Sequence, residues 1–168
     1  MNQFQDLTDF LDKYDIKYTV KSDCVEVNGD VDMHDELLSE LPESFGFLRI
    51  NGSLYLDGNA LKFLPESFGN LKVTEILDLS NNSLQSLPES FGDIEVGGDL
   101  FIDCNELEPI KTSFANLKVG GEIWEDDQIE DCTSEWSKKF TEIGDEMDSA
   151  LSHLIDCMQK LQEHIKTV

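Results

Sequence analysis

Apolar residues recur along this chain at a fixed spacing of 23 residues. The clearest markers are four phenylalanines, Phe45, Phe68, Phe91 and Phe114. The hexapeptide LPESFG contains the first three of them, at 41–46, 64–69 and 87–92, and a degenerate copy, IKTSFA, occupies 110–115. A constant period of this length indicates structural units that stack on one another, not a single globular core.

Apolar and polar residues also alternate within each unit. The apolar members are the pairs Val31/Met33, Leu54/Leu56, Leu77/Leu79 and Leu100/Ile102, with Ile123 in the last unit. Alternation with a period of two predicts a β-strand with one buried face. Because each strand has the same place in its repeat, we expect one parallel sheet whose strands are joined by extended return segments. The sequence thus predicts an α/β solenoid of about five 23-residue units over 27–132.

Two further columns of equivalent residues complete the predicted coil. Asn59, Asn82 and Asn105 recur at the same period, and an inward amide there can bond the backbone of the turn that follows each strand. Prolines in the LPESFG segments favour a short turn, or one turn of helix, on the far side. We expect the phenylalanine rings to stack beneath that side.

The ends of a repeat stack need caps, because they expose apolar edges. Residues 1–26 predict an N-terminal cap, made of a helix over 2–14 and a hairpin that pairs 16–20 with 24–27. The apolar residues of the helix fall on one face. They are Phe4, Leu7, Phe10, Leu11 and Tyr14.

Residues 133–168 predict an amphipathic C-terminal helix with a heptad-like stripe. The candidate oligomerisation residues are Phe140, Ile143, Met147, Leu151, Leu154, Met158, Leu161 and Ile165. A continuous helix of this length would measure about 50 Å, whereas five strands span only about 19 Å. The segment therefore either folds back as a helical hairpin near Gly144 or projects and pairs with a second copy as a coiled coil. Residues 133–168 could thus form a homodimer interface or simply cap the repeat stack.

The outward positions of the predicted strands form a candidate binding surface. No Lys or Arg occupies any of them, and acidic residues surround aromatic ones. Aromatic anchors within acidic surroundings suit the Lys and Arg side chains of a partner. The candidate partner-binding residues are Asp32, Tyr55, Asp57, Asp78, Asp99, Phe101, Asp103, Glu122, Trp124 and Asp126. The alternative is a solvated acidic sheet with Trp124 covered by the C-terminal helix.

Charge narrows the class of partner. The formal net charge is −24 over 168 residues, and residues 1–132 hold 29 of the acids but only 8 of the bases. Direct nucleic-acid binding and binding to anionic membranes are therefore not expected, since both need Lys and Arg. A basic protein is the expected partner, because long-range attraction would draw it in. Alternatively, the charge only keeps the chain soluble and monomeric.

Other chemistry is not evident in the sequence. The four cysteines, Cys24, Cys104, Cys132 and Cys157, form no CxxC pair, and no histidine stands at ligand spacing from them. We therefore expect no metal site, no cofactor and no catalytic activity. The absence of a leader-like start and of an apolar run of about 18 residues predicts a cytoplasmic protein with four free thiols.

The repeated residues carry a family resemblance. The segments LPESFGNL, VGG and LxLxxNxL resemble a leucine-rich repeat of the short bacterial and viral kind, over about 27–132. The opening residues are similar to those of repeat proteins from large phages. The resemblance implies protein recognition through the sheet face, without naming a partner.

Two classes of function follow from these observations. The first is an interaction module that binds a basic protein. Its sharper form is a phage counter-defence inhibitor that imitates DNA and occupies the nucleic-acid site of a host enzyme in the host cytoplasm. The second class is a structural or assembly protein that oligomerises through the C-terminal helix.

Overall fold

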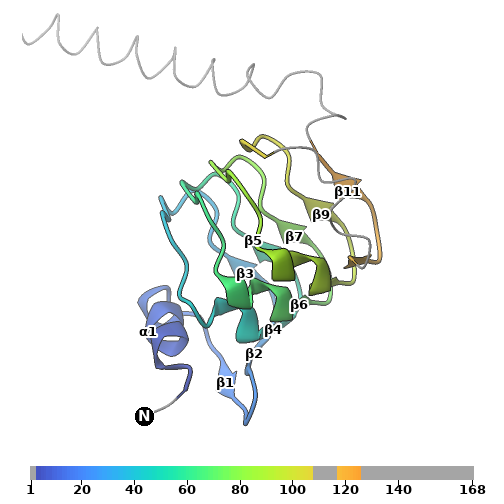
Figure 1. Ribbon diagram of the computed structural model, residues 1–168. Coiled ribbons are helices and arrows are strands. Elements are labelled where there is room, and N and C mark those ends of the chain that lie inside the picture. The colour runs from blue at the N-terminus through green and yellow to red at the C-terminus, as the bar shows by residue number, and fades with distance from the viewer. Residues whose placement is uncertain (1–2, 108–116, 126–168) are drawn as a thin grey trace, which may run out of the picture. The chain divides into compact units, whose positions relative to one another are not determined.

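The computed structural model of the chain describes residues 3–107 and 117–125. The chain divides into two units, Met1–Glu130 and Asp131–Val168, and every described residue belongs to the first. Within that unit, the strands of successive repeats lie side by side (Figure 1). The predictions for Asp126, for the fourth phenylalanine of the column and for the C-terminal helix lie outside the described residues.

The N-terminal segment forms the helix and hairpin that the sequence predicts. Helix α1 spans Gln5–Lys13, and β1 (Thr19–Val20) pairs antiparallel with β2 (Val25–Asn28). Leu7 and Leu11 of the helix are fully buried. The ring of Phe10 meets that of Phe45 edge-on, at 5.9 Å between centroids, so the helix packs on the first coil of the repeat region.

The alternating segments form a five-stranded parallel sheet, as predicted. Its order is β3–β5–β7–β9–β11, with each strand hydrogen-bonded to the equivalent strand of the next repeat. The strands are β3 (Val31–Asp32), β5 (Leu54–Tyr55), β7 (Leu77–Asp78), β9 (Leu100–Phe101) and β11 (Ile123–Trp124). The apolar member of each pair faces the core, and Val31, Leu54, Leu77 and Leu100 are all fully buried.

The expectation of a single sheet is wrong, because a second sheet runs beside the first. Six strands form it, in the order β1–β2–β4–β6–β8–β10, and all but the β1–β2 pair are parallel. The new strands are β4 (Leu48–Asn51), β6 (Lys72–Val73), β8 (Glu95–Val96) and β10 (Lys118–Val119). In β4, buried Leu48 and Ile50 alternate with the more exposed Arg49 and Asn51, so this strand also has one buried face.

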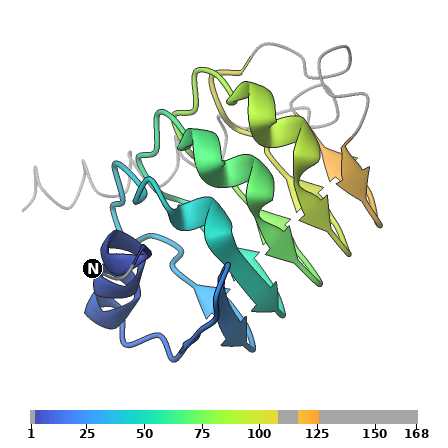
Figure 2. The same cartoon turned by 60° about the horizontal axis from the view of Figure 1, so that its bottom comes forward.

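The far side of each coil carries a short 3₁₀ helix at the PESFG segment. These helices are η1 (Phe45–Phe47), η2 (Glu66–Asn70) and η3 (Glu89–Asp93), and they lie in a row in Figure 2. Beneath them the rings of Phe45, Phe68 and Phe91 stack at 6.0 Å between successive centroids, within 9° of parallel. The predicted ring stack is confirmed for these three residues, none of which is exposed.

The asparagine column also takes the predicted role. The Nδ2 group of Asn82 donates to the carbonyls of Leu56, Leu79 and Ser80, and its Oδ1 accepts from the N–H of Leu61. Asn59 and Asn105 repeat this arrangement one coil to either side. Each amide therefore joins the turn of its own coil to the backbone of the preceding coil.

A further column concerns the backbone of the turn after each strand of the five-stranded sheet. Asp35, Gly58, Asn81 and Cys104 are spaced 23 residues apart and have positive φ angles between 51° and 67°. Only glycine adopts this left-handed region without a steric cost, and Asn and Asp tolerate it better than other residues. Each coil thus turns at the same place with the same backbone geometry.

The cysteines depart from one expectation. Cys24 is a buried free thiol, as predicted. Cys104 is disulfide-bonded. The expectation of four free thiols is therefore wrong at Cys104.

Candidate functional site

The outward side of the five-stranded sheet is acidic throughout its described part. We call this surface the acidic face. Its fourteen described positions contain no Lys or Arg. They are Asp30, Ser53, Ile76, Asp99 and Glu122; Asp32, Tyr55, Asp78, Phe101 and Trp124; and His34, Asp57, Ser80 and Asp103.

The central column of the acidic face lines up as the sequence predicts. Strand register pairs Asp32 with Tyr55, Tyr55 with Asp78, Asp78 with Phe101, and Phe101 with Trp124. The Phe101 and Trp124 rings stack at 5.9 Å between centroids and 9° from parallel. Asp32 is exposed, and the other four are half-buried, so the rings are supported by the sheet while part of each faces outward.

The flanking columns are less open than the alternation suggests. Glu122 is exposed, and Asp57 and Asp99 are half-buried, but Asp103 is only 7% exposed. Ser53 and Ser80 are buried as well. The three buried residues flank the two-residue strands β5, β7 and β9 and do not lie within them. The structure therefore brings nine of the ten predicted partner-binding residues onto one side of one sheet, with Asp103 enclosed there and Asp126 outside the described range.

Several acids of this surface also have structural hydrogen bonds. Oδ1 of Asp99 accepts from the backbone N–H of Glu122 at 2.8 Å, bridging two coils. Oδ1 of Asp78 accepts from the N–H and the hydroxyl of Ser80, at 2.9 and 2.6 Å. These bonds fix the directions of the carboxylates, so the negative charges are held in place on the sheet.

The acids influence one another electrostatically. Burial, and then the neighbouring carboxylate of Asp78, raise the pKa of Asp57 above its ordinary value. At the first coil the hydrogen bond from His34 lowers the pKa of Asp32, and Asp32 in turn raises the pKa of His34. Burial is the larger cause of the raised pKa of Asp57, and the negative charge of Asp78 adds to it.

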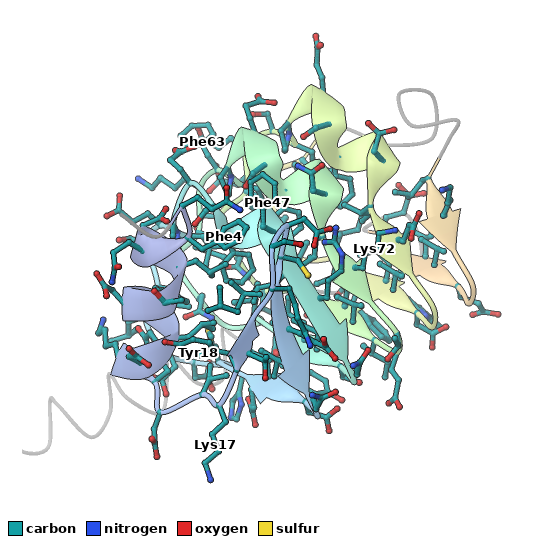
Figure 3. The ribbon with its side chains drawn as sticks, turned by 90° about the horizontal axis from the view of Figure 1, so that it is seen from below. Phe4, Lys17, Tyr18, Phe47, Phe63 and Lys72 are labelled. Carbon is teal, nitrogen blue, oxygen red and sulfur yellow. The ribbon has the colours of Figure 1, made fainter. Side chains whose placement is uncertain are left out.

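The outward side of the second sheet has a different character. Register aligns Glu26, Arg49, Lys72, Glu95 and Lys118 in one column. The Glu95 carboxylate lies between two ammonium groups, 2.5 Å from Lys72 and 2.9 Å from Lys118. First Lys72 and then Lys118 lower the pKa of Glu95 to about 2. Figure 3 shows Lys72 over this part of the sheet.

A shallow groove of about 580 Å³ runs beside this column, across β6, β8 and β10. Gly97 and Gly120 line it at the position that Thr74 has in an earlier coil. The lysines at its rim are already paired with Glu95, so this surface has mixed charge and contrasts with the acidic face. Sequence analysis missed the charged column, although the alternation over 48–51 would have indicated it.

Over residues 3–107 and 117–125, no three His, Cys, Asp or Glu side chains are grouped to hold a metal ion. None of the helices in those ranges is long and apolar enough to span a bilayer.

Comparison with known proteins bears on the repeat itself. The model of the family described as Leucine Rich Repeat matches residues 74–94, from the turn before β7 to the end of η3. This match supports a leucine-rich repeat protein. Leucine-rich repeats are a common protein–protein interaction module. No curated protein matches the chain significantly.

Proposed function

We propose that this chain is a non-enzymatic protein–protein interaction module whose acidic face binds a basic protein surface. The observation that carries the proposal is the aligned central column, in which three aromatic rings and two carboxylates share a face with no Lys or Arg at its described positions. Aromatic side chains supply contact area at low entropic cost, and the surrounding acids supply complementarity to Lys and Arg.

The energetics of the face support a binding role. Like charges on neighbouring strands disfavour folding, and the effect of Asp78 on the pKa of Asp57 shows such a repulsion. Partly exposed rings such as Phe101 and Trp124 lose apolar burial as well. Contact with a basic partner would relieve both costs, because it pairs the carboxylates and covers the rings.

A finer form of the proposal is a counter-defence inhibitor of the phage-like LPESFG repeat type, which competes with nucleic acid for a host enzyme. The acidic excess of the repeat region supports this form. An enzyme inhibited in this way should be released by added DNA, and the inhibition should weaken as salt rises. Inhibition indifferent to both would leave the general interaction module but remove the DNA-imitating form.

Dimerisation through residues 133–168 is a separate proposal, supported by the heptad-like spacing of the apolar residues there. Sedimentation of the full chain and of a chain ending at residue 132 tests it. We expect the full chain to sediment as a dimer and the shortened chain as a monomer that still binds partner. If the full chain also sediments as a monomer, the dimer is rejected.

The binding proposal is tested by reversing charge on the acidic face. Asp32 and Glu122 are exposed members of the face, which makes them better choices than buried Asp103. We expect Asp32→Lys combined with Glu122→Lys to reduce affinity for a partner captured from lysate by about tenfold or more, since rim charges and steering are lost. Binding is measured by titration with the purified partner.

The matched control reverses two acids elsewhere. Glu66 and Glu89 lie on η2 and η3, away from the sheet face, and both are exposed. Glu66→Lys with Glu89→Lys changes the net charge by the same amount and should leave affinity within about twofold. Equal losses in the two double variants would show that net charge, not the acidic face, is recognised.

A further inference from the structure

The middle of the acidic face holds a carboxylate between two aromatic residues. Tyr55, Asp78 and Phe101 occupy equivalent places on β5, β7 and β9, where register pairs Tyr55 with Asp78 and Asp78 with Phe101. We propose that these three residues form a slot for a single arginine side chain. The inference rests on the proposed function and specifies the group that the partner inserts.

The spacing of the strands suits one cation. Neighbouring strands lie about 4.8 Å apart, so Tyr55 and Phe101 are separated by about 10 Å across β7. A cation above Asp78 is then about 5 Å from each ring, inside the limit of about 6 Å for a cation–π contact.

Ring orientation at this position supports the slot. Phe101 stacks on Trp124 of the next coil, with the two planes 9° apart. These two rings therefore turn their faces along the stack of coils. One face of Phe101 is covered by Trp124, and its other face is directed toward the coil that carries Asp78.

The carboxylate at the base of the slot is fixed and lies in a negative environment. Ser80 donates two hydrogen bonds to Oδ1 of Asp78, which sets the direction of the group. Asp57 lies close enough for Asp78 to raise its pKa, so a second carboxylate reinforces the negative potential. A guanidinium can donate to a carboxylate while its flat faces lie against rings, which an ammonium cannot do as well.

The slot is specific to one coil. Asp78 has an aromatic residue at both neighbouring register positions. Asp32, the other acid of the central column, has Tyr55 on one side and stands on the edge strand β3. His34 of the acidic face is engaged with Asp32 and does not occupy the slot.

The test uses peptides rather than the natural partner. The pentapeptide Gly-Ser-Arg-Ser-Gly, with blocked ends, and its lysine counterpart are titrated into the full chain at constant ionic strength, and ring resonances are followed by NMR. We expect the arginine peptide to shift the rings of Tyr55 and Phe101 and to bind about threefold or more tightly than the lysine peptide. Equal affinities would overturn the assignment to arginine.

Matched variants locate the site. Asp78→Asn should weaken the arginine peptide by about fivefold, whereas Glu122→Gln, which removes the same charge from the same face, should change it less than about twofold. Tyr55→Leu should weaken binding and Tyr55→Phe should preserve it, since only the first removes a ring. Thermal unfolding of each variant confirms that it is folded.

Two outcomes would overturn the slot: equal losses for Asp78→Asn and Glu122→Gln, or no loss for Tyr55→Leu. Either leaves the proposed function standing if the charge reversal at Asp32 and Glu122 still weakens partner binding by about tenfold or more. Conversely, consider a charge reversal that leaves partner affinity unchanged while the arginine peptide binds as expected. The arginine site would then stand, and the natural partner would bind elsewhere on the chain.

Discussion

At the scale of single residues, the stack depends on side chains that take the place of missing backbone partners. Asn82 is 9% exposed and satisfies three carbonyls and one N–H of two coils. The sequence predicts this role, because three asparagines stand at the repeat period. The left-handed turn residues were not predictable in the same way, since Asp, Gly, Asn and Cys share no side-chain chemistry that would mark a column.

Asn82→Ala should lower the free energy of unfolding by roughly 2–4 kcal/mol, because it leaves buried carbonyls and an N–H without partners. Urea denaturation measures the change. Asn81→Ala is a useful comparison, since the neighbouring residue is less buried and should cost about 1 kcal/mol through its left-handed φ. Equal costs would mean that the amide ladder contributes little.

At the scale of elements, helix α1 substitutes for a coil that would precede the first one. Each serine of an ESFG segment bonds toward the preceding coil: Ser67 Oγ accepts from the N–H of Gly46, and Ser90 Oγ donates to the carbonyl of Glu66. For Ser44 the preceding element is the helix, and both its hydroxyl and its N–H donate to the Asp6 carboxylate. Helical periodicity predicts the helix. It does not predict the Asp6–Ser44 contact, because the two residues are 38 positions apart and meet only in the folded chain.

Asp6 makes the stability of the cap depend on pH. Burial disfavours its charge, but the hydrogen bonds from Ser44 outweigh this, and the pKa of Asp6 is lowered in the fold. The resulting stability is present above the unfolded pKa of about 3.9 and is lost as pH falls through the folded value. Asp6→Ala should therefore cost about 1 kcal/mol at pH 7 and less near pH 3.

Denaturation at both pH values measures that difference, with Asp9→Ala as the control on the same helix. The Asp9 carboxylate accepts a hydrogen bond from Gln5 within the same helix, so its removal should cost little at either pH. A cost for Asp6→Ala that stays constant with pH would show that its charge is not the cause.

At the scale of the whole molecule, charge is distributed unequally between the two sheets. The described residues contain seven Lys and Arg, of which Arg49, Lys72 and Lys118 lie in the column of the second sheet and none lies on the acidic face. Composition predicts the acidic excess. Composition does not predict where the bases gather, because it carries no positional information, and the sequence pattern predicts only extended return segments where the second sheet lies.

The acidic excess should make folding sensitive to salt. Self-repulsion at a net charge of −24 destabilises the compact chain, and screening becomes strong when the Debye length falls to about 8 Å at 0.15 M salt. We expect the melting temperature to rise by a few degrees between 0.01 and 0.15 M NaCl, as measured by calorimetry. A falling melting temperature would show that ion pairs such as Lys72–Glu95 outweigh the repulsion.

The unequal charge of the two sheets gives the repeat region as a whole a permanent electric dipole moment. A positively charged molecule approaching in dilute salt would exert a torque on it before any atoms touch. The unit would rotate until its negative side led, so a larger share of random collisions would begin in a productive orientation. Speed of capture would then depend on Arg49, Lys72 and Lys118 of the second sheet as well as on the acids of the first.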